Sequence, residues 1–450
     1  MPESRDTLSD RSDGNGDKKS LVRLLVASTS GNTIEFYDFF LYASATALVF
    51  GKVFFPSDDP LTSVFLAFSV YAVGFLSRPL GGVIFGHIGD RYGRRTALVW
   101  TLLLMGASTF AIGLVPPYAQ IGAVAPALLV AIRLIQGIAL GGEWAGAVIL
   151  VAEHVSDKKR GLWTSIPQIG APLGNLISAG VLFLLGAIMS NASFEAWGWR
   201  VAFFLSAILV CIGLYTRLRI DETPLFKQNQ KDSGHRRKKL PLAEVLKNYK
   251  RETLVVMFYR IGENTVYYIF TIFLIVYTTD ILHLPKGVAL AAIMVGSVVQ
   301  ALAFIAGGAW SDRIGRKKTI LLGMVGLVVW SFLYYFMVNT KSTGLIILAV
   351  CVGVALHGLI VGPAAAFVLE LFGTDVRFSG ASVGYQIGGV LGGAIAPLIA
   401  IKLLQNYHSW VPVAWYLAGV CVLAGISVMF GTEGRGKSFE EIDAAHKPGD

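Results

Sequence analysis

The sequence predicts an all-α membrane protein with twelve transmembrane helices in two pseudo-symmetric six-helix halves. Of its 450 residues, 54% are hydrophobic and only 15% are charged, whereas soluble chains carry about 25% charged residues. The apolar residues gather in stretches long enough for membrane helices of about 20 residues. A loop motif also occurs twice, half a chain apart. Together these observations favour a duplicated, membrane-embedded bundle.

The loop motif reads G-H-I-G-D-R-Y-G-R-R at residues 86–95 and G-A-W-S-D-R-I-G-R-K at residues 308–317. Two of its Gly, its Asp and two of its Arg return at one constant offset. Glu153 and Arg160 are spaced like Glu370 and Arg377. Solenoid repeats have periods of only about 20–50 residues, so this repeat indicates a duplicated half-protein.

The predicted elements alternate with polar segments along the chain. Residues 1–20 form a polar tail without a signal peptide, 217–251 a basic linker and 432–450 a second polar tail, and these separate the halves 21–216 and 252–431. The helices are expected at 22–50, 61–86, 96–115, 122–151, 162–190 and 198–216 in the first half, and at 253–280, 288–310, 318–338, 343–370, 378–404 and 410–431 in the second.

The net charge of +9 could suggest a nucleic-acid partner, but the basic residues cluster in the loops between apolar stretches. Loops rich in Lys and Arg lie on the cytoplasmic side of a membrane. We therefore expect a multi-pass protein of the cell membrane, with the linker and both termini cytoplasmic and no nucleic acid bound. The three cysteines lie within apolar stretches without metal-ligand spacing, so no metal and no cofactor are expected.

Further motifs suggest a family. The fourth stretch carries R-L-I-Q-G from Arg133 and then G-G-E-W, the first carries G-N-T-I-E-F-Y-D-F from Gly31, and the second ends S-R-P-L-G-G from Ser77. With the loop motifs, these resemble the major facilitator superfamily and, within it, the metabolite:proton symporter family. The run S-V-G-Y-Q from Ser382 is most similar to shikimate-type transporters. The resemblance implies proton-driven uptake of a small organic acid across the cell inner membrane. A monomer is expected, because twelve spans can enclose their own pathway.

Several ionisable residues lie inside apolar stretches, where a charge costs about 2.5–3.5 kcal/mol or more and marks a functional site by default. We expect Asp38 to lie near Arg133 and to take the coupling proton when that arginine turns to the substrate. The superfamily resemblance places a first-helix acid and a fourth-helix arginine similarly. Buried structural ion pairs are the alternative interpretation. The candidate proton-coupling residues are Asp38, Glu35, Arg133 and Glu263, with His357 as a further possibility.

An anionic substrate needs a fixed positive charge, and the guanidinium of Arg binds a carboxylate through two parallel hydrogen bonds. Arg133 and Arg260 provide one such group from each half. Polar and aromatic residues at helical spacing around them could bind substrate hydroxyls, or could simply pack between helices. The candidate substrate-binding residues are Arg133, Arg260, Gln136, Trp144, Gln168, Asn264, Tyr267, Tyr268 and Gln386.

The two loop motifs predict a cytoplasmic gate. Asp90 and Asp312 are expected to cap the helix that follows each of them. Arg94 and Arg316 are expected to pair with Glu153 and Glu370 and to hold the cytoplasmic side closed. The candidate gate residues are Asp90, Arg91, Arg94, Glu153, Arg160, Asp312, Arg313, Arg316, Glu370 and Arg377.

Three alternatives remain open. The substrate could be a zwitterion, as in the osmoprotectant carriers of the same family. The chain could be an efflux antiporter, because sequence does not fix the direction of transport. A membrane enzyme or receptor is disfavoured, because the sequence has no P-loop, no metal-spaced His/Cys/Asp cluster and no nucleophile elbow.

Overall fold

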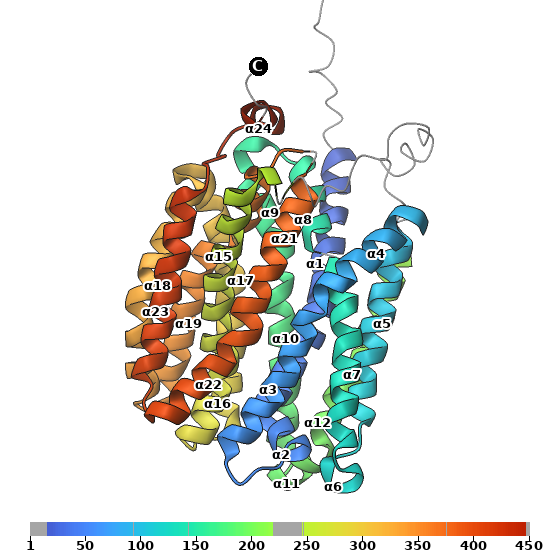
Figure 1. Cartoon of the computed structure of the whole chain (residues 1–450), viewed down its shortest axis with the longest axis vertical. Coiled ribbons are helices and arrows are strands. Elements are labelled where there is room, and N and C mark those ends of the chain that lie inside the picture. The colour runs from blue at the N-terminus through green and yellow to red at the C-terminus, as the bar shows by residue number, and fades with distance from the viewer. Residues whose placement is uncertain are drawn as a thin grey trace, which may run out of the picture.

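The computed structural model describes residues 16–446 except 93, 143, 219–244, 246 and 375. For some residues within helices, among them Asp90, Arg91, Arg94 and Trp144, it describes the backbone alone. The described chain is helical and forms one elongated bundle, with the first half in blue and green and the second in yellow to red (Figure 1).

The first half runs through sixteen helical elements. They are α1 (Gly16–Ala45), η1 (Thr46–Phe50), α2 (Gly51–Phe54), α3 (Pro60–Leu76), α4 (Arg78–Tyr92), α5 (Arg94–Leu114), α6 (Tyr118–Ile121), α7 (Val124–Ala139), η2 (Leu140–Gly142), α8 (Trp144–Glu153), η3 (Asp157–Lys159), α9 (Arg160–Gln168), α10 (Gly170–Ile188), α11 (Asn191–Ser193), η4 (Phe194–Gly198) and α12 (Trp199–Leu218).

The second half begins beyond the linker. Its elements are α15 (Lys250–Tyr268), η5 (Ile269–Phe273), α16 (Leu274–Val276), η6 (Tyr277–Ile281), α17 (Lys286–Ile314), α18 (Arg316–Val338), α19 (Thr343–Val361), α20 (Ala364–Glu370), α21 (Arg377–Gly389), η7 (Val390–Ala394), α22 (Ile395–Tyr407), α23 (Val411–Phe430) and α24 (Phe439–His446).

Helices cover each of the twelve predicted apolar stretches. Among the described residues, nine helical segments are long and apolar enough to cross a membrane, and Val99–Leu114 and Val124–Ala139 are shorter apolar helices. The remaining stretch is the run from α1 to α2, which carries the charges of the first helix. The predicted all-α membrane architecture is therefore present.

The bundle has two distinct ends. The α24 end carries α8, α9 and α24, and the α11 end carries α2, α6 and α11 (Figure 1). Helix α1 already starts at Gly16, within the expected N-terminal tail, and α24 forms a helix within the expected C-terminal tail. A helix can extend beyond its apolar stretch into water, so hydropathy locates the span and not the helix end.

The first helical run of each half contains a π-helical turn, η1 after α1 and η5 after α15. The two turns are separated by nearly the same offset as the two loop motifs. A π-turn is rare and often marks a functional site. The similarity of the two halves therefore extends from the loops to the first helical run of each half.

Glycines allow α7 to touch both α3 and α4 backbone to backbone. A Cβ on Gly137 of α7 would lie 2.1 Å from the carbonyl oxygen of Gly74 in α3, and one on Gly81 of α4 would lie 1.9 Å from that of Ile138. Only glycine permits these approaches. The close crossing brings the face of α7 that carries Arg133 against α3 and α4.

The two halves meet along α9 and α10, which pack on α17, and along α3, which packs on η7 and α22. Gly161 of α9 and Gly308 of α17 form the closest crossing, since a Cβ on either would lie within 2.7 Å of the other's carbonyl oxygen. The first glycine of the second loop motif thus has a packing role between the halves.

Candidate functional site

Arg133 lies fully buried on α7. Its Nη1 donates to Oε1 of Gln136 at 2.5 Å, and Nε2 of Gln136 donates to the Thr109 hydroxyl at 2.8 Å. The guanidinium carbon lies 4.2 Å from the ring centroid of Tyr42 and 4.8 Å from that of Tyr71. Cation–π contacts with these two rings therefore stabilise the positive charge of Arg133 and hold its guanidinium group in place.

Asp38, on α1, is also fully buried. Neither of its carboxylate oxygens has a hydrogen-bond partner among the described residues, and no ion pair joins it to Arg133 in that part of the chain. In this conformation Asp38 and Arg133 are therefore not paired, and the expected coupling between them remains a prediction. Gln136, one turn along α7, takes up the guanidinium instead, and the side chain of Thr109 is the polar neighbour of Asp38.

Arg78, at the start of α4, is a half-buried charge that the sequence interpretation missed. Its guanidinium carbon lies 4.6 Å from the ring centroid of Phe39 and 4.3 Å from that of Phe75. It interacts electrostatically with Glu35 of α1. The same rule that selected Arg133, an ionisable residue inside an apolar stretch, would have found it within the S-R-P-L-G-G motif.

The second half contributes a chain of three ionisable side chains. Arg260 and Glu263, one turn apart on α15, form an ion pair, and Nε2 of His357 on α19 lies 3.3 Å from Oε1 of Glu263. On α17, Nε2 of Gln300 lies 2.9 Å from Nδ1 of His357. Glu263 and His357 are buried, and the side chain of Arg260 is 12% exposed.

The other predicted substrate ligands divide into two groups. Tyr267 and Tyr268 are buried where the halves meet, with Tyr267 accepting from Asn175 at 2.7 Å and Tyr268 packing on Phe39. Gln168 and Gln386 instead donate to backbone carbonyls of the opposite half, at 3.1 and 3.3 Å. These two glutamines hold the halves together in this conformation. The side chain of Trp144 lies outside the described residues.

Several buried polar atoms at this meeting point lack hydrogen-bond partners among the described residues. They include both oxygens of Asp38, Nε and Nη2 of Arg133, Nε of Arg260, Nδ2 of Asn264 and Nε2 of His357. Buried polar groups are normally satisfied, so such atoms call for an explanation. They include donors from both halves, as a site for a small polar anion requires.

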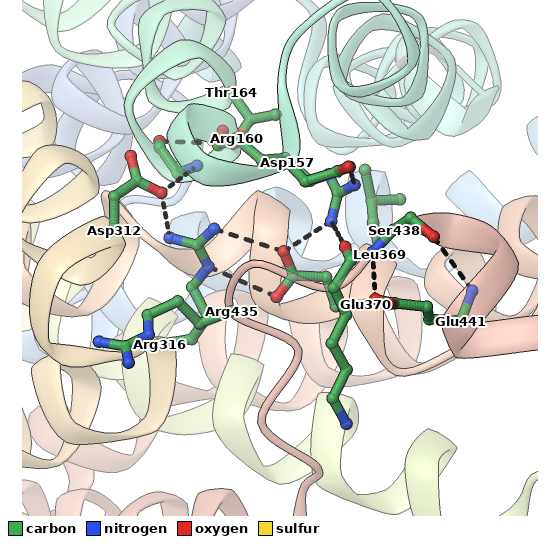
Figure 2. Close-up of polar contacts among 12 residues, drawn as sticks. Asp157, Arg160, Thr164, Asp312, Arg316, Leu369, Glu370, Arg435, Ser438 and Glu441 are labelled. Atoms are coloured by element: carbon green, nitrogen blue, oxygen red, sulfur yellow. Dashed lines mark hydrogen bonds and ion pairs between the residues drawn. The ribbon is translucent and has the colours of Figure 1, made fainter. Parts of the chain in front are cut away.

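At the α24 end, Glu370 lies between two arginines. Its Oε1 accepts from Nη1 of Arg160 at 3.0 Å and pairs with Nη2 of Arg316 at 3.4 Å, and its Oε2 accepts from Nε of Arg316 at 3.4 Å (Figure 2). The predicted pair Arg316–Glu370 is present. The contact with Arg160 crosses between the halves, and the side chains of Arg160 and Glu370 are buried. Arg160 also pairs with Asp157.

We expected Asp312 to cap the helix that follows it. It instead caps a helix of the other half. Its two oxygens accept from the backbone N–H groups of Gly161 and Leu162 at the start of α9, both at 2.9 Å. The start of α18 is capped by Glu433 of the C-terminal segment, which accepts from the N–H groups of Arg316 and Lys317. Helix caps are predicted from residues next to the helix start. Here each cap comes from a carboxylate that lies far away in the sequence, so the prediction missed it.

The remaining gate candidates lie around this cluster. Arg377 donates to the carbonyls of Leu369 and Phe372 and interacts electrostatically with Glu153. Arg313 is exposed, and its carbonyl accepts from Arg435. The side chains of Asp90, Arg91 and Arg94 lie outside the described residues, so their predicted contacts remain predictions.

A duplicated helical bundle with charged side chains buried between its halves is the architecture of a secondary transporter. Residues 31–384 match the family model of the Major Facilitator Superfamily. The chain belongs to this superfamily.

Curated relatives agree. "Inner membrane metabolite transport protein YhjE" of Escherichia coli (strain K12) is 38% identical, over 92% of this chain and 95% of that protein. The shikimate transporter of the same organism is 35% identical, over 90% and 93%, and its proline/betaine transporter is 35% identical, over 91% and 83%. The resemblance to metabolite:proton symporters is thereby confirmed, and the chain is a multi-pass membrane transporter, not an enzyme.

A solved structure shows the same fold. The proton:xylose symporter XylE, bound to 6-bromo-6-deoxy-D-glucose, aligns with a TM-score of 0.75 over 96% of this chain and 100% of that one. The sequences are only 18% identical, so this likeness concerns the fold alone.

Proposed function

We propose that this chain is a symporter that imports a small organic acid, such as shikimate or a related carboxylate, together with protons by alternating access. The observation that carries the proposal is the set of unpaired buried donors on Arg133, Arg260 and Asn264, which come from both halves. The carboxylate of a substrate could accept two parallel hydrogen bonds from such a guanidinium group. The similarity to the shikimate transporter supports this substrate class.

Asp38 is the proposed coupling acid. It is buried, and its oxygens have no hydrogen-bond partner among the described residues. A buried carboxylate without a cation beside it is stabilised by taking a proton. Its charge would then change as Arg133 moves between Gln136 and the substrate. Glu35 is the alternative coupling acid.

The basic loops support an orientation in which the α24 end faces the cytoplasm of a cell inner membrane, with both termini on that side. Arg160, Arg316, Glu370 and Asp312 would then form the cytoplasmic gate. A monomer is sufficient for this function, because both halves of the pathway belong to one chain.

A zwitterion is the second candidate substrate. The rings of Phe39, Tyr71, Phe75 and Tyr268 gather beside the arginines of the site. Aromatic faces attract quaternary ammonium groups, and the proline/betaine transporter is as similar in sequence as the shikimate transporter.

Proteoliposomes with an imposed inward proton gradient test the proposal. External pH is followed while shikimate, other small acids and glycine betaine are added one at a time. External alkalinisation tied to one acid supports acid:proton symport. The same response to betaine alone supports the zwitterion, and expulsion of preloaded substrate as protons enter supports an antiporter. Saturable uptake without proton movement contradicts coupling.

The variant Asp38→Asn tests the coupling acid. It removes the charge that must change during the cycle, so accumulation driven by the proton gradient should fall to the background while substrate exchange continues. Accumulation and exchange of the identified substrate are measured in the same vesicles. Full accumulation by this variant would rule out Asp38 as the coupling acid.

A further inference from the structure

The ion pair of Arg260 and Glu263 places one of the protein's own carboxylates on a guanidinium proposed to bind substrate. Both residues lie on α15, and Arg260 also stacks on Tyr385, with 3.8 Å between the guanidinium carbon and the ring centroid. Nε of Arg260 and Nδ2 of the neighbouring Asn264 find no acceptor in the described part of the chain. Glu263 thus satisfies only part of the donor set that a substrate carboxylate would use.

His357 lies on the other side of Glu263 and also contacts Gln300. The amide nitrogen of Gln300 can only donate, so Nδ1 of His357, 2.9 Å away, accepts. In a neutral imidazole the proton then lies on Nε2, which faces Oε1 of Glu263 at 3.3 Å. A doubly protonated ring would require Gln300 to turn its amide and present its oxygen. The cluster therefore has two distinct hydrogen-bonding arrangements.

We propose that Glu263 occupies the place of the substrate carboxylate on Arg260, and that an incoming carboxylate displaces it toward His357, which takes up a proton. Before binding, the cluster holds one cation, one anion and a neutral imidazole. After binding, Arg260 is paired with the substrate, and Glu263 with an imidazolium. Its net charge is the same in both states, so one monocarboxylate and one proton bind together. The inference rests on the proposed acid:proton symport and adds a second proton site to it.

The surroundings favour this exchange. A buried carboxylate stripped of its cation is costly, which links loss of the Arg260 contact to proton uptake. Arg78 adds a second positive charge near Arg260, and the phenol groups facing the cluster carry no charge near neutral pH. The ionisable groups that face Arg260 and Glu263 from the packed elements are Arg78, Tyr259, Tyr267, Tyr268, Tyr385 and His357.

Binding of radiolabelled shikimate to the purified full-length protein tests the inference, with benzoate as a second monocarboxylate. The wild-type affinity should fall about tenfold or more from about pH 6 to about pH 8, because binding requires a proton. Glu263→Gln removes the internal competitor and its charge. Its affinity should vary less over this range than that of the wild type and should exceed that of the wild type at the higher pH by about tenfold.

His357→Gln tests the proton acceptor, because glutamine can still donate to Glu263 but cannot take up a proton. Its affinity at the lower pH should fall toward the wild-type value at the higher pH. Proton uptake on binding, followed with an indicator dye in weak buffer, should be smaller in both variants than in the wild type, because only the proton taken up by Asp38 then remains. Glu440→Gln and His154→Gln change exposed side chains at the α24 end and should behave like the wild type.

The outcomes separate this inference from the proposed function. If the wild type accumulates shikimate with protons but Glu263→Gln keeps the wild-type pH profile and proton uptake, the displacement mechanism is wrong and acid symport stands. A wild-type pH profile in His357→Gln would overturn the role of His357. If the wild type binds and transports neither acid, acid symport fails and this inference fails with it. Should both variants misfold, proton uptake by Asp38→Asn decides: its loss would contradict a second proton site.

Discussion

Glu370 is the carboxylate through which the two halves are linked by charge at the α24 end. It receives Arg160 from one half and Arg316 from the other, inside a buried cluster. Removing one partner from a buried ion pair costs about 3–5 kcal/mol, because the remaining charges are left uncompensated. That cost falls mainly on the closed conformation, since opening would expose these groups to water.

Glu370→Gln should therefore favour opening of the α24 end by a factor of about 100. Ser165, buried on α9 beside Gly308, can report the opening as a cysteine. In a background without Cys211, Cys351 and Cys421, a water-soluble maleimide should label Ser165→Cys faster when Glu370→Gln is present. Glu440→Gln, at an exposed residue of α24, should leave the rate unchanged. Equal labelling rates in both variants would exclude Glu370 from the gate.

Asp59 has the corresponding position at the α11 end, where it precedes α3. It accepts from the Thr62 hydroxyl at 2.6 Å, from the N–H groups of Leu61 and Thr62, and from Gln405 of the other half at 3.0 Å. The Thr62 hydroxyl, followed by the two backbone N–H groups and Gln405, lowers the pKa of Asp59 below its ordinary value. These hydrogen bonds favour the charged form and cap α3.

The pH dependence follows from the direction of this shift. A depressed folded-state pKa stabilises the protein at a pH above the ordinary aspartate value of about 3.9, and the contribution disappears as the pH falls through the folded-state value. The melting temperature of the purified protein should therefore exceed that of Asp59→Asn near neutral pH, and the difference should shrink on acidification below about pH 4. A difference that grows on acidification would contradict the assignment.

The helix α24 covers the gate from outside. The ring of Phe439 contacts two guanidinium groups: its centroid lies 4.0 Å from the guanidinium carbon of Arg160 and 3.7 Å from that of Arg377. Ile442 of the same helix is buried. Asp443 accepts from the N–H and the hydroxyl of Thr374, both at 2.7 Å. The C-terminal segment thus touches both halves, and it stabilises the conformation in which they are joined at this end.

Ending the chain after Gly436 should weaken that closure while leaving the Glu433 cap of α18 in place. Each cation–π contact is worth about 0.5–2 kcal/mol, so labelling of Ser165→Cys should accelerate about fivefold or more. Removal of residues 447–450 alone is the matched control and should have no effect. Unchanged labelling after loss of α24 would mean that the helix only rests on a gate closed by Glu370.

The sequence predicts those features that depend on neighbouring residues in the chain, and it misses those that depend on contacts between distant residues. Apolar stretches are local, and all twelve coincide with helices. Asp38, Arg133, Glu263 and His357 were recognisable because ionisable residues are rare in such stretches, and they are buried. The partner of Asp312 and the docking of α24 depend on residues far away in the chain. The placement of Arg133 beside Gln136, away from Asp38, depends on rotamers and helix spacing that no sequence pattern encodes.

As a whole, the molecule is joined across its halves at both ends. The α24 end is held by Arg160–Glu370 and by Asp312 on α9, and the α11 end by Gln405 on Asp59. The charges of Asp38, Arg133, Arg260 and Glu263 lie on α1, α7 and α15, which belong to both halves. Alternating access requires each end to open in turn while the other stays closed, so either contact should be able to arrest the cycle if it is made permanent.

A reversible cross-link tests this requirement at the α11 end. Asp59→Cys with Gln405→Cys joins the two halves through a short bis-thiosulfonate linker, in the background without native cysteines. Transport should fall to the background after cross-linking and return after reduction, because this end can no longer open. Lys52→Cys with Glu195→Cys is the matched control, since these residues form a 2.8 Å ion pair at the same end but within one half. Its cross-linked form should transport normally. Full transport by the cross-linked Asp59/Gln405 pair would show that the halves need not separate there, and rocking of one half against the other would have to be abandoned.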